Sequence, residues 1–463
     1  MNRPYRKAAP CRLAALPLTG LGLAGLRLAG LGLAALAPAT AAASTLTLQR
    51  IDNSAAVISV VTAPAGGTAS AYALNLTGGT IRAIEADGTL RAQPVLDAIA
   101  DPEGETLGNV WDIAFAPAHA ISGRAYLSFT TYTEDAGLRS YSHVVAEVLR
   151  DPTDPDRFDP ASLRRILTVP HPDAAQSGAH FGGALSFGPD DMLYVTTGDS
   201  WLPRQGLNIA QDVTDMRGAV LRIDPTGDDF PSDPLRNHAI PAGQPDFGPD
   251  ADPALWAIGL RNPFKARWDG PTGRYFIADV GEDDWEEINL GLAGANYGWS
   301  AWEGPDPLAE GELSPLGTLT FPLYSYPHDL DSPFGGISVT GGEVYRGPLA
   351  ALDGQYIFGD YNVSGAPGRI WSFDAATSMP GAPVALTAWT LEVEGPGALR
   401  NIIGFGSDSE GRFYVSDIFT GLYVITGASA AVAVIPLPAS LGFTLGGLAL
   451  LGGLALRRRR AAG

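Results

Sequence analysis

The stretch Leu185-Ser-Phe-Gly-Pro-Asp190 and the run that follows it, Leu193-Tyr-Val-Thr-Thr-Gly-Asp199, contain the pattern that decides the fold. A short apolar run ends in a turn of Gly, Pro and Asp, and an aromatic-centred run rich in β-branched residues comes next. Such a unit predicts two strands joined by a tight connection. The unit recurs in residues 113–129, 266–279, 352–360 and 403–417, and second strands are predicted in residues 144–148, 219–224, 369–373 and 422–425.

Repetition of a sheet-sized unit, with almost no helical periodicity, predicts an all-β chain. Residues 80–88 add an earlier unit, which brings the count to about six. In a β-propeller each sheet buries its faces against its neighbours, so we predict an all-β, six-bladed β-propeller. An elongated solenoid is the alternative, although its period would be more regular. Segments 228–253 and 300–332 are rich in Pro, Gly and Asp and predict long loops, where ligands are usually bound.

The two ends of the chain differ in composition from this body. The N-terminus has Arg3, Arg6 and Lys7, then an apolar stretch over residues 13–36, then Ala41-Ala42-Ala43. This order is typical of a secretory signal peptide, which we place at residues 1–43. Cys11 precedes the apolar stretch, so a lipoprotein anchor is not expected and the mature chain should contain no cysteine.

The C-terminus has Ile435-Pro-Leu-Pro-Ala439, an uncharged apolar stretch over about residues 440–456, and Arg457-Arg-Arg-Arg460. It predicts a membrane-spanning segment with the arginines on the cytoplasmic side. This order resembles the VPLPA-type, PEP-CTERM-like sorting signal, which implies an exosortase-type processing enzyme and transient or lasting anchoring in the inner membrane. A plain C-terminal anchor is the alternative. We therefore divide the chain into residues 1–43, the propeller 44–430, and the sorting signal 431–463.

The charge of the body argues against polyanionic partners. Nine of the 30 basic residues and none of the 50 acidic residues lie in the two ends, which leaves 21 basic residues and a net charge of −29 in the body. Such a body repels nucleic acid and anionic membranes, and it suits cation binding.

Three motifs in the body carry chemistry. His180-Phe-Gly-Gly183 offers an imidazole that can take a proton. Arg261-Asn262-Pro263 places a guanidinium beside a carboxamide, a pair that can hold an anionic or polyhydroxylated ligand. The turn 281–287 is dense in carboxylates, which suits a hard cation. Together these motifs predict a polar site for a small molecule.

Further motifs surround these three in a fixed order, among them Gly218-Ala-Val-Leu-Arg-Ile-Asp224, Trp285-Glu-Glu-Ile-Asn-Leu290 and Asn296-Tyr-Gly-Trp299. From about residue 78 to 427 the ordered set resembles the glucose/sorbosone dehydrogenase family, whose six-bladed propellers include quinoprotein sugar dehydrogenases. Thr340-Gly-Gly-Glu-Val-Tyr-Arg-Gly347 and Phe358-Gly-Asp-Tyr361 are closer to the branch resembling the hedgehog-interacting-protein propeller.

The resemblance implies a role for each site residue. His180 would be the base that takes a sugar hydroxyl proton while hydride passes to pyrroloquinoline quinone (PQQ). Arg261, Asn262 and Arg400 would contact the quinone. The carbonyls of Gly281 and Glu282 would bind a calcium ion, and the Glu287 carboxylate and the Tyr297 carbonyl would bind a second, structural one. We expect Asp283, Asp284 and Glu286 to be solvated charges, and a buried structural arginine is the alternative role for Arg261.

The sequence departs from the family pattern at three places. Residues 359–365 contain no lysine to pair with a quinone carboxylate, Ala398 stands where a second arginine is expected, and Ala179 replaces the aspartate that often precedes the histidine. Each missing charge-assisted contact would cost about 1.5–3 kcal/mol of cofactor binding.

The sequence thus leads us to expect an exported PQQ- and calcium-dependent protein that oxidises the C1 hydroxyl of an aldose or oligosaccharide. Its place would be periplasmic, cell-surface or extracellular, and its partner a sugar or polysaccharide. Two alternatives stay open: a non-catalytic calcium-binding propeller that binds glycan or protein at the cell surface, and a calcium-dependent lactonase that uses the cation and Asn262 to polarise an ester carbonyl.

Overall fold

The computed structural model describes residues 43–53, 56–172, 180–201, 208–308, 311–362 and 366–430. The chain divides into the units Met1–Ala41 and Ala42–Gly463, and the fold given below is that of the second unit. The predicted signal peptide, apart from Ala43, and the predicted sorting signal, including its spanning segment, lie outside the described residues. Within the described part of the chain, no helix is both long and apolar enough to cross a membrane.

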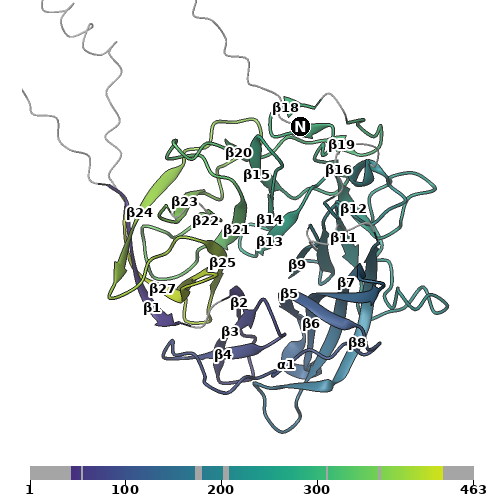
Figure 1. Cartoon of the computed structure of the whole chain (residues 1–463), viewed down its shortest axis with the longest axis horizontal. Coiled ribbons are helices and arrows are strands. Elements are labelled where there is room, and N and C mark those ends of the chain that lie inside the picture. Colours follow the sequence, from purple (N-terminus) through teal and green to yellow (C-terminus); the bar gives the residue numbers. More distant parts are fainter. Residues whose placement is uncertain are drawn as a thin grey trace, which may run out of the picture. The chain divides into compact units, whose positions relative to one another are not determined.

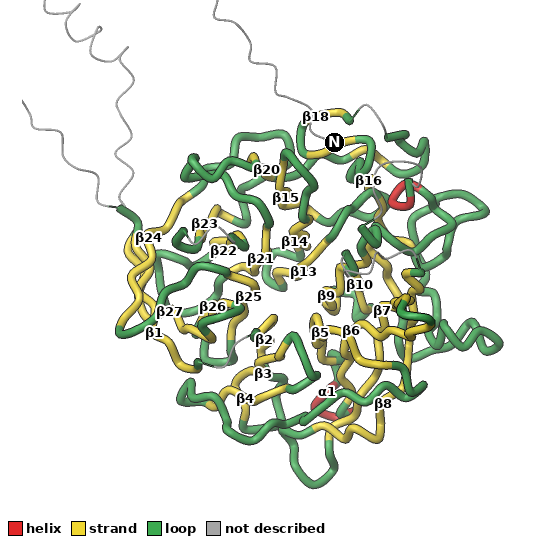
Figure 2. The backbone as a smooth tube through the Cα atoms, viewed as in Figure 1, coloured by secondary structure: helices red, strands yellow, loops and turns green. Residues whose placement is uncertain are grey.

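The described body is almost entirely β-structure (Figure 2). Its first two sheets follow chain order: β2 (Val57–Thr62), β3 (Ala69–Asn75), β4 (Ile81–Glu85), and then β5 (Thr106–Phe115), β6 (Arg124–Asp135), β7 (Leu138–Arg150), β8 (Phe158–His171). Among the described residues, the helical elements are a single turn, α1 (His119–Ser122), and a short 3-10 segment at Ile209–Gln211.

The next two sheets contain the motifs identified above. One consists of β9 (Gly182–Phe187), β10 (Leu193–Thr197), β11 (Ala219–Ile223), β12 (Leu255–Ile258), β16 (Ala295–Asn296) and β19 (Thr318–Leu319). The other consists of β13 (Pro263–Asp269), β14 (Arg274–Asp279), β15 (Trp285–Leu290) and β20 (Tyr324–Pro327). Between β15 and β20 in the chain, β17 (Trp302–Glu303) and β18 (Asp306–Pro307) form a separate two-stranded sheet. All five residues of β10 are buried, which explains its continuous run of β-branched and aromatic side chains.

The remaining strands form one large sheet through the first strand of the chain. They are β21 (Val339–Val344), β22 (Gln355–Asp360), β23 (Arg369–Asp374) and β24 (Thr387–Glu394), then β1 (Thr45–Asp52), and then β27 (Gly421–Ser429), β26 (Phe413–Asp417) and β25 (Ile402–Ser407). The strand β1 pairs antiparallel with β27, where Leu48 lies opposite Ile425, and parallel with β24. Strands from the two ends of the described body therefore lie side by side.

The leading strands of consecutive sheets form a closed series (Figure 1). The strand β2 contacts β5, β5 contacts β9, β9 contacts β13, β13 contacts β21, β21 contacts β25, and β25 contacts β2 again. A solenoid would leave its first and last repeats apart, so the solenoid alternative is wrong. The all-β, propeller-type fold predicted from the sequence is confirmed.

One of the two predicted loops is wrong in part. Residues 300–332 contain β17 to β20, and β20 pairs with β15 as the last strand of its sheet. The short alternation Tyr324-Ser-Tyr-Pro327 explains the strand, because Tyr326 is buried and packs its ring against Trp371 at 5.1 Å. The surrounding Pro and Gly residues hide so short a strand in the composition.

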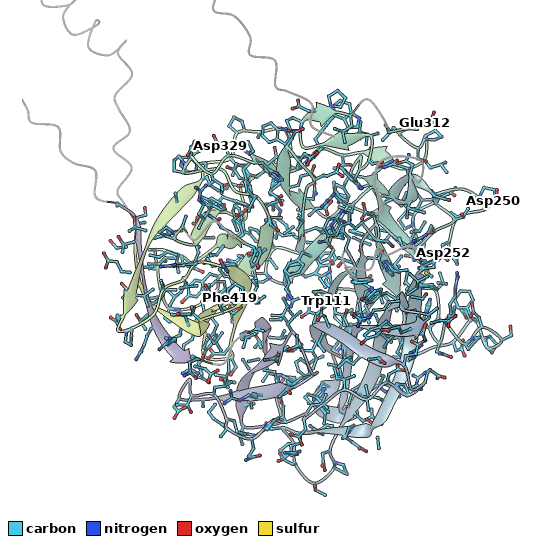
Figure 3. All side chains as sticks on the ribbon, in the orientation of Figure 1. Trp111, Asp250, Asp252, Glu312, Asp329 and Phe419 are labelled. Carbon is cyan, nitrogen blue, oxygen red and sulfur yellow. The ribbon has the colours of Figure 1, made fainter. Side chains whose placement is uncertain are left out.

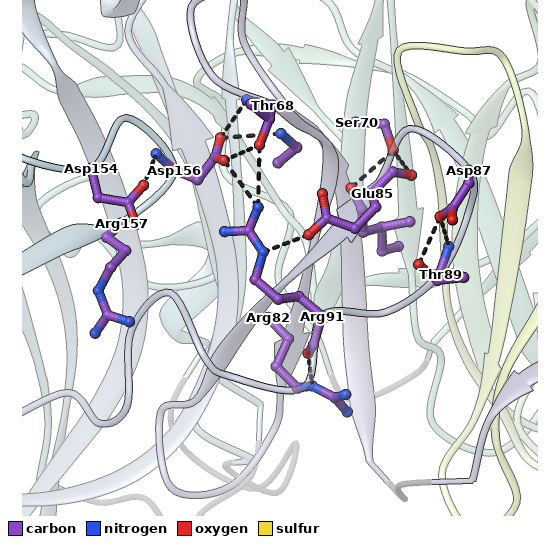
Figure 4. A network of polar contacts seen from close by, with 12 residues as sticks. Thr68, Ser70, Arg82, Glu85, Asp87, Thr89, Arg91, Asp154, Asp156 and Arg157 are labelled. Carbon is purple, nitrogen blue, oxygen red and sulfur yellow. Dashed lines mark hydrogen bonds and ion pairs between the residues drawn. The ribbon is translucent and has the colours of Figure 1, made fainter.

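Polar contacts also join neighbouring sheets. The Arg91 guanidinium, which follows β4, pairs with Glu85 at 2.5 Å and with Asp156, between β7 and β8, at 3.0 Å (Figure 4). Asp156 also accepts a hydrogen bond from the Thr68 hydroxyl at 2.5 Å. This network, centred on the buried Asp156 carboxylate, links the sheet β2–β4 to the sheet β5–β8.

Candidate functional site

The loops that carry the three motifs meet at one end of the leading strands. The backbone N–H of Gly182 donates to Asn262 Oδ1 at 3.1 Å, which links the start of β9 to the start of β13. The N–H of Val280, just after β14, donates to the Asn262 carbonyl at 3.1 Å. The N–H of Asp199 donates to the Arg261 carbonyl at 2.8 Å. Residues far apart in the sequence are thus brought to one place by adjacent strands.

The imidazole of His180 is held by a carboxylate. His180 Nδ1 lies 2.8 Å from Asp199 Oδ1, and Asp199 Oδ2 accepts the indole N–H of Trp299 at 2.8 Å. A neutral imidazole in this contact donates its Nδ1 hydrogen, so Nε2 is left with the lone pair. Asp199 therefore supplies the orientation that the sequence lacks at position 179, which lies outside the described residues.

The environment keeps His180 neutral. Burial lowers its pKa below the ordinary value, the nearby Arg261 guanidinium lowers it further, and the Asp199 contact offsets part of the decrease. The ring also stacks on Trp201, with centroids 5.2 Å apart and planes 5° from parallel. A base must be unprotonated to accept a proton, so this setting suits general-base chemistry near pH 7.

The backbone around this pair is strained. His180, Ser200 and Trp201 have positive φ angles of 59°, 71° and 55°. Residues other than glycine adopt this left-handed region at a cost of about 1–3 kcal/mol each. Such residues persist only where the surrounding structure holds them in place, and they cluster at functional sites.

Arg261 is buried and engaged with protein. Its guanidinium donates to the Val280 carbonyl at 3.1 Å and lies over the Trp299 ring at 5.4 Å, and its backbone N–H donates to Asp279 at 2.9 Å. These contacts agree with the structural role left open for Arg261, and they also fix its position beside His180.

Asn262 lies on the wall of a central cavity of about 200 Å³. Strands β2, β5, β13, β21 and β25 each contribute to the wall, so the cavity lies where the leading strands converge. Trp111, on β5, lies near the centre of the ring of sheets (Figure 3). None of the lining residues, all of which the structure describes, is charged: Ile58, Leu76, Trp111, Asn262, Phe264, Val280, Ser338, Val339, Thr340, Tyr361, Ile403 and Ile418.

The acidic turn is organised by a carboxylate from outside it. Glu303 accepts four backbone hydrogen bonds through one oxygen, from Glu282, Asp283, Asp284 and Trp285, at 2.6–3.2 Å. Gly281 has no room for a side chain, because a Cβ there would lie 1.6 Å from the Trp285 carbonyl oxygen. The Glu282 carboxylate is close enough to raise the pKa of His180.

Three acidic residues of this turn were expected to be solvated, and for one of them this is wrong. Asp283 and Asp284 are exposed, but Glu286 is fully buried. Glu286 contacts His328 Nε2 at 2.6 Å and accepts the N–H of Val339 at 2.8 Å. Four consecutive residues of β15, Glu286–Asn289, are buried, so both faces of this strand are covered and Glu286 is kept from solvent.

Glu287 lies among other buried carboxylates. Its oxygens accept the N–H of Gly304 at 2.7 Å and the Asn289 amide at 2.9 Å. Burial raises the pKa of Glu287 to about 7, helped by the charges of Glu303 and Glu286. Burial and the Glu287 charge likewise raise the pKa of Asp279 well above its ordinary value.

The donor chemistry around Glu287 fits a hard cation. A cation would stabilise this concentrated negative charge, and the Oδ1 atom of Asn289 is buried without a hydrogen-bond partner beside it. Tyr297 is buried on the connection after β16, and its N–H donates to the Ile258 carbonyl at 2.9 Å. Within the described residues, no group of three or more His, Cys, Asp or Glu side chains is arranged to hold a metal, so calcium binding here would depend on backbone carbonyls as well.

Arg400 lies in a different cleft. Its backbone N–H donates to Asp417 at 2.7 Å, and its exposed side chain lines a surface cleft with Pro367, Leu391 and Leu399. The central cavity therefore receives Asn262 but not Arg400 among its lining residues.

Residues 73–326 match the glucose/sorbosone dehydrogenase family, over more than half of the chain. The chain belongs to this family. Among curated relatives, the HIPL1 protein of Arabidopsis thaliana is 31% identical over 317 residues, covering 58% of this chain and 45% of the relative. The Hedgehog-interacting protein of Mus musculus is 27% identical over 73% of this chain and 45% of its own length. The aldose sugar dehydrogenase YliI of Escherichia coli is 26% identical over a match that covers 49% of this chain and 54% of the relative.

The chain spans about half the length of these curated relatives. Solved structures of the family share the fold over most of both chains. The soluble aldose sugar dehydrogenase of Escherichia coli superposes with a TM-score of 0.61 at 19% identity, over 82% of this chain and 99% of that one. The PQQ-bound aldose sugar dehydrogenase of Streptomyces coelicolor superposes with a TM-score of 0.55 at 18% identity, over 84% of this chain and 98% of that one.

The family cofactor PQQ can be tested against this site. Asn262 lines the central cavity and could contact a ring oxygen there, whereas Arg261 is buried and does not line the cavity. The wall of the central cavity, however, supplies no cation for the carboxylates of PQQ, Arg400 lines another cleft, and residues 359–365 contain no lysine. Asn262 therefore suits the polar edge of the PQQ ring, but the carboxylates of PQQ find no partner in the cavity wall, and burying a carboxylate without a partner is costly.

Proposed function

We propose that this site removes the hydroxyl proton of a sugar or related polyol during oxidation of the carbon that carries the hydroxyl. The contact between His180 Nδ1 and Asp199 at 2.8 Å carries the proposal. It leaves Nε2 of a neutral imidazole, which is stacked on Trp201, as the proton acceptor. An aldose or oligosaccharide with its C1 hydroxyl at His180 is the proposed substrate, in keeping with the relative named as an aldose sugar dehydrogenase.

The neighbouring residues would assist this chemistry. The carboxylate of Asp199 stabilises the imidazolium that forms when His180 accepts the proton. Glu282 adds negative charge nearby, and the Trp201 ring fixes the imidazole plane. Oxidation of the sugar also needs a hydride acceptor, which in this family is PQQ. The cavity wall supplies no partners for the carboxylates of PQQ, and this disfavours PQQ as the acceptor in this chain.

Calcium binding at Gly281, Glu282, Glu287 and Tyr297 is part of the proposal. The buried, mutually repelling carboxylates around Glu287 support it. We also propose six blades, supported by the closed series of leading strands. Export, with exosortase-type processing at the inner membrane, is supported by the composition of the two ends.

The test uses the full-length protein, purified with calcium, in a dye-reduction assay with aldoses, with and without added PQQ. Turnover that is lost in His180→Asn and kept in His119→Asn would support the proposal. Absence of turnover with every acceptor would refute the enzyme assignment. Saturable PQQ binding that survives Arg261→Met would contradict the role assigned to Arg261.

A non-catalytic binding protein is the second candidate. The uncharged wall of the central cavity favours it, as does the similarity to the Hedgehog-interacting protein. Glycan-array binding that persists in His180→Asn, in a protein that oxidises no sugar, would favour this candidate over the first.

A further inference from the structure

A second histidine, His171 at the end of β8, contacts the loops of the proposed base from the neighbouring sheet β5–β8. Its Nδ1 atom lies 2.6 Å from the Ser200 hydroxyl oxygen, and its ring meets the Phe181 ring edge-on, with centroids 4.9 Å apart. Phe181 directly follows His180 in the chain. Ser200 directly follows Asp199. One ring from the neighbouring sheet therefore contacts the chain neighbours of both members of the His180–Asp199 pair.

Ser200 has a conformation that needs support. It is fully buried, and its φ angle of 71° lies in the left-handed region, where a serine persists only when its surroundings fix it. Its backbone N–H donates to the His180 carbonyl at 3.2 Å. The N–H of the next residue, Trp201, donates to Asp199 Oδ1 at 2.8 Å. A shift of Ser200 would therefore be transmitted to both members of the pair.

The hydroxyl of Ser200 supplies this support through two contacts. Arg217 Nη1 donates to the hydroxyl oxygen at 3.2 Å, since a guanidinium can only donate, and Arg217 also donates to Asp215 at 2.7 Å. Within the described residues the other polar contact of this hydroxyl is His171 Nδ1, so the hydroxyl hydrogen is donated there. Acceptance requires a neutral imidazole, and burial lowers the pKa of His171 well below the ordinary value, with His143 and Arg217 lowering it further. The hydrogen bonds therefore run from Arg217 through Ser200 to His171.

We propose that His171 is a positioning residue for the proposed base. By accepting the Ser200 hydrogen and packing on Phe181, it fixes the Asp199 carboxylate against Nδ1 of His180 and so selects the Nδ1–H tautomer. An imidazole that loses this contact can place its hydrogen on Nε2, which then cannot accept a proton. His171 itself is fully buried and contacts no substrate in this role. Selection of the tautomer does not require turnover, whereas its effect on rate rests on the proposed function.

Nitrogen NMR of the full-length protein, isotope-labelled only in histidine, reports the tautomer directly. The chain has six histidines, and the His180 signals are those lost in His180→Asn. We expect the wild type to show the Nδ1–H tautomer alone. His171→Leu, which removes the acceptor and keeps an apolar side chain against Phe181, should show a mixture that contains the Nε2–H tautomer. His171→Asn should keep the wild-type pattern, because its amide oxygen can accept the Ser200 hydrogen in place of Nδ1.

The matched control is His143→Leu. His143 is also buried and also contacts a serine, Ser128 at 2.8 Å, but that serine lies on β6 rather than in the loop 199–201. The control should lose stability and leave the His180 tautomer unchanged. Ser200→Ala removes the same hydrogen bond as His171→Leu and should give the same mixture, so the test stands even where His171→Leu does not fold. A wild-type pattern in Ser200→Ala, or equal mixtures in His171→Leu and His143→Leu, would overturn the positioning role.

A double variant tests whether His171 acts through Asp199. Asp199→Asn should itself give a mixture of tautomers. Adding His171→Leu should change the ratio no further, since both substitutions remove the same restraint. A further change of the ratio in the double variant would contradict the path through Asp199.

Turnover is read separately. In an active protein His171→Leu should reduce kcat roughly 10- to 100-fold, with a smaller change in KM, because the base is misplaced or carries its hydrogen on the wrong nitrogen. The expected change of tautomer in a protein that oxidises no sugar would sustain the positioning role and refute the proposed enzyme function. A lower kcat with an unchanged tautomer would overturn the positioning role.

Discussion

Asp112 and Arg267 form a two-point ion pair that joins the leading strands β5 and β13. The contacts are 2.5 Å from Nη1 to Oδ2 and 2.7 Å from Nη2 to Oδ1. Asp112 also accepts the N–H of Leu185 on β9 at 3.0 Å and the hydroxyl of Ser59 on β2 at 3.1 Å. Burial acts to raise the pKa of Asp112, but Arg267 and Lys265 hold it below its ordinary value. Four leading strands therefore converge on one buried carboxylate.

Arg267→Met should destabilise the protein by about 3–5 kcal/mol, because it leaves the Asp112 charge buried without its partner. Urea unfolding followed by circular dichroism measures the loss. Arg139→Met is the control: Arg139 pairs with Glu134 at the surface, with side chains 43% and 50% exposed, so the loss should stay below about 1 kcal/mol. If the two variants unfold at the same urea concentration, the buried pair does not fasten the strands.

Asp199→Asn should lower the pKa of His180, because the Asp199 contact opposes the effects of burial and Arg261. The imidazole resonances of His180 should titrate at lower pH in the variant by NMR, whether or not the protein turns over. In an active protein, loss of the oriented base should reduce kcat by roughly 10²–10⁴-fold. An unchanged titration would show that Asp199 does not govern the imidazole.

Calcium should raise the melting temperature of the wild-type protein, by an amount equivalent to about 2.7 kcal/mol at a hundredfold excess over Kd. Chelation should reverse the gain. Glu287→Gln should remove most of the response, since an amide is a poorer ligand for a hard cation, while the exposed Asp284→Asn should retain it. A wild-type melting curve indifferent to chelator at low salt would eliminate the calcium site.

Acid should destabilise the fold through His143. Burial lowers the pKa of this histidine from 6.5 to about 4, so the unfolded state binds the proton more readily. The stabilising difference is complete above the unfolded pKa and is lost as pH falls from 6.5 toward 4. Between pH 7 and pH 5 this group alone should cost about 2 kcal/mol. His143→Gln should lose correspondingly less over that interval in urea titrations; parallel losses would exclude His143 as the acid-sensitive group.

Much of the strand order could be predicted from the sequence. Turn residues bound the aromatic and β-branched runs, so the predicted unit 113–129 and the predicted strands at 193–199 and 219–224 overlap β6, β10 and β11. The pairing of β1 with β24 and β27 could not be predicted, because a local sequence pattern carries no information about strand partners several hundred residues away. Tyr324–Pro327 was missed for a different reason: four residues among prolines are too few to show a period.

For the site, residue types were easier to predict than their partners. His180, Arg261 and Asn262 lie in recognisable motifs, and neighbouring strands bring them together. Asp199 was missed as the partner of His180, although its position directly after the strand Leu193–Thr197 was a usable signal, since strand ends on one side of a propeller meet. The apolar wall of the cavity comes from five strands at once, and no single segment reveals it.

The pairing of β1 with β27 has a consequence for how the protein reaches its folded state. Nearly the whole body separates these partners, so the last sheet stays incomplete until residues 421–429 are available. The closing contact is the one of greatest sequence separation, and such contacts form late and slowly. A chain crossing a membrane from its N-terminus would hold β1 unpaired until its other end had followed. If the chain is exported as proposed, we expect the ring to close only after passage is complete, which would couple folding to arrival at the destination.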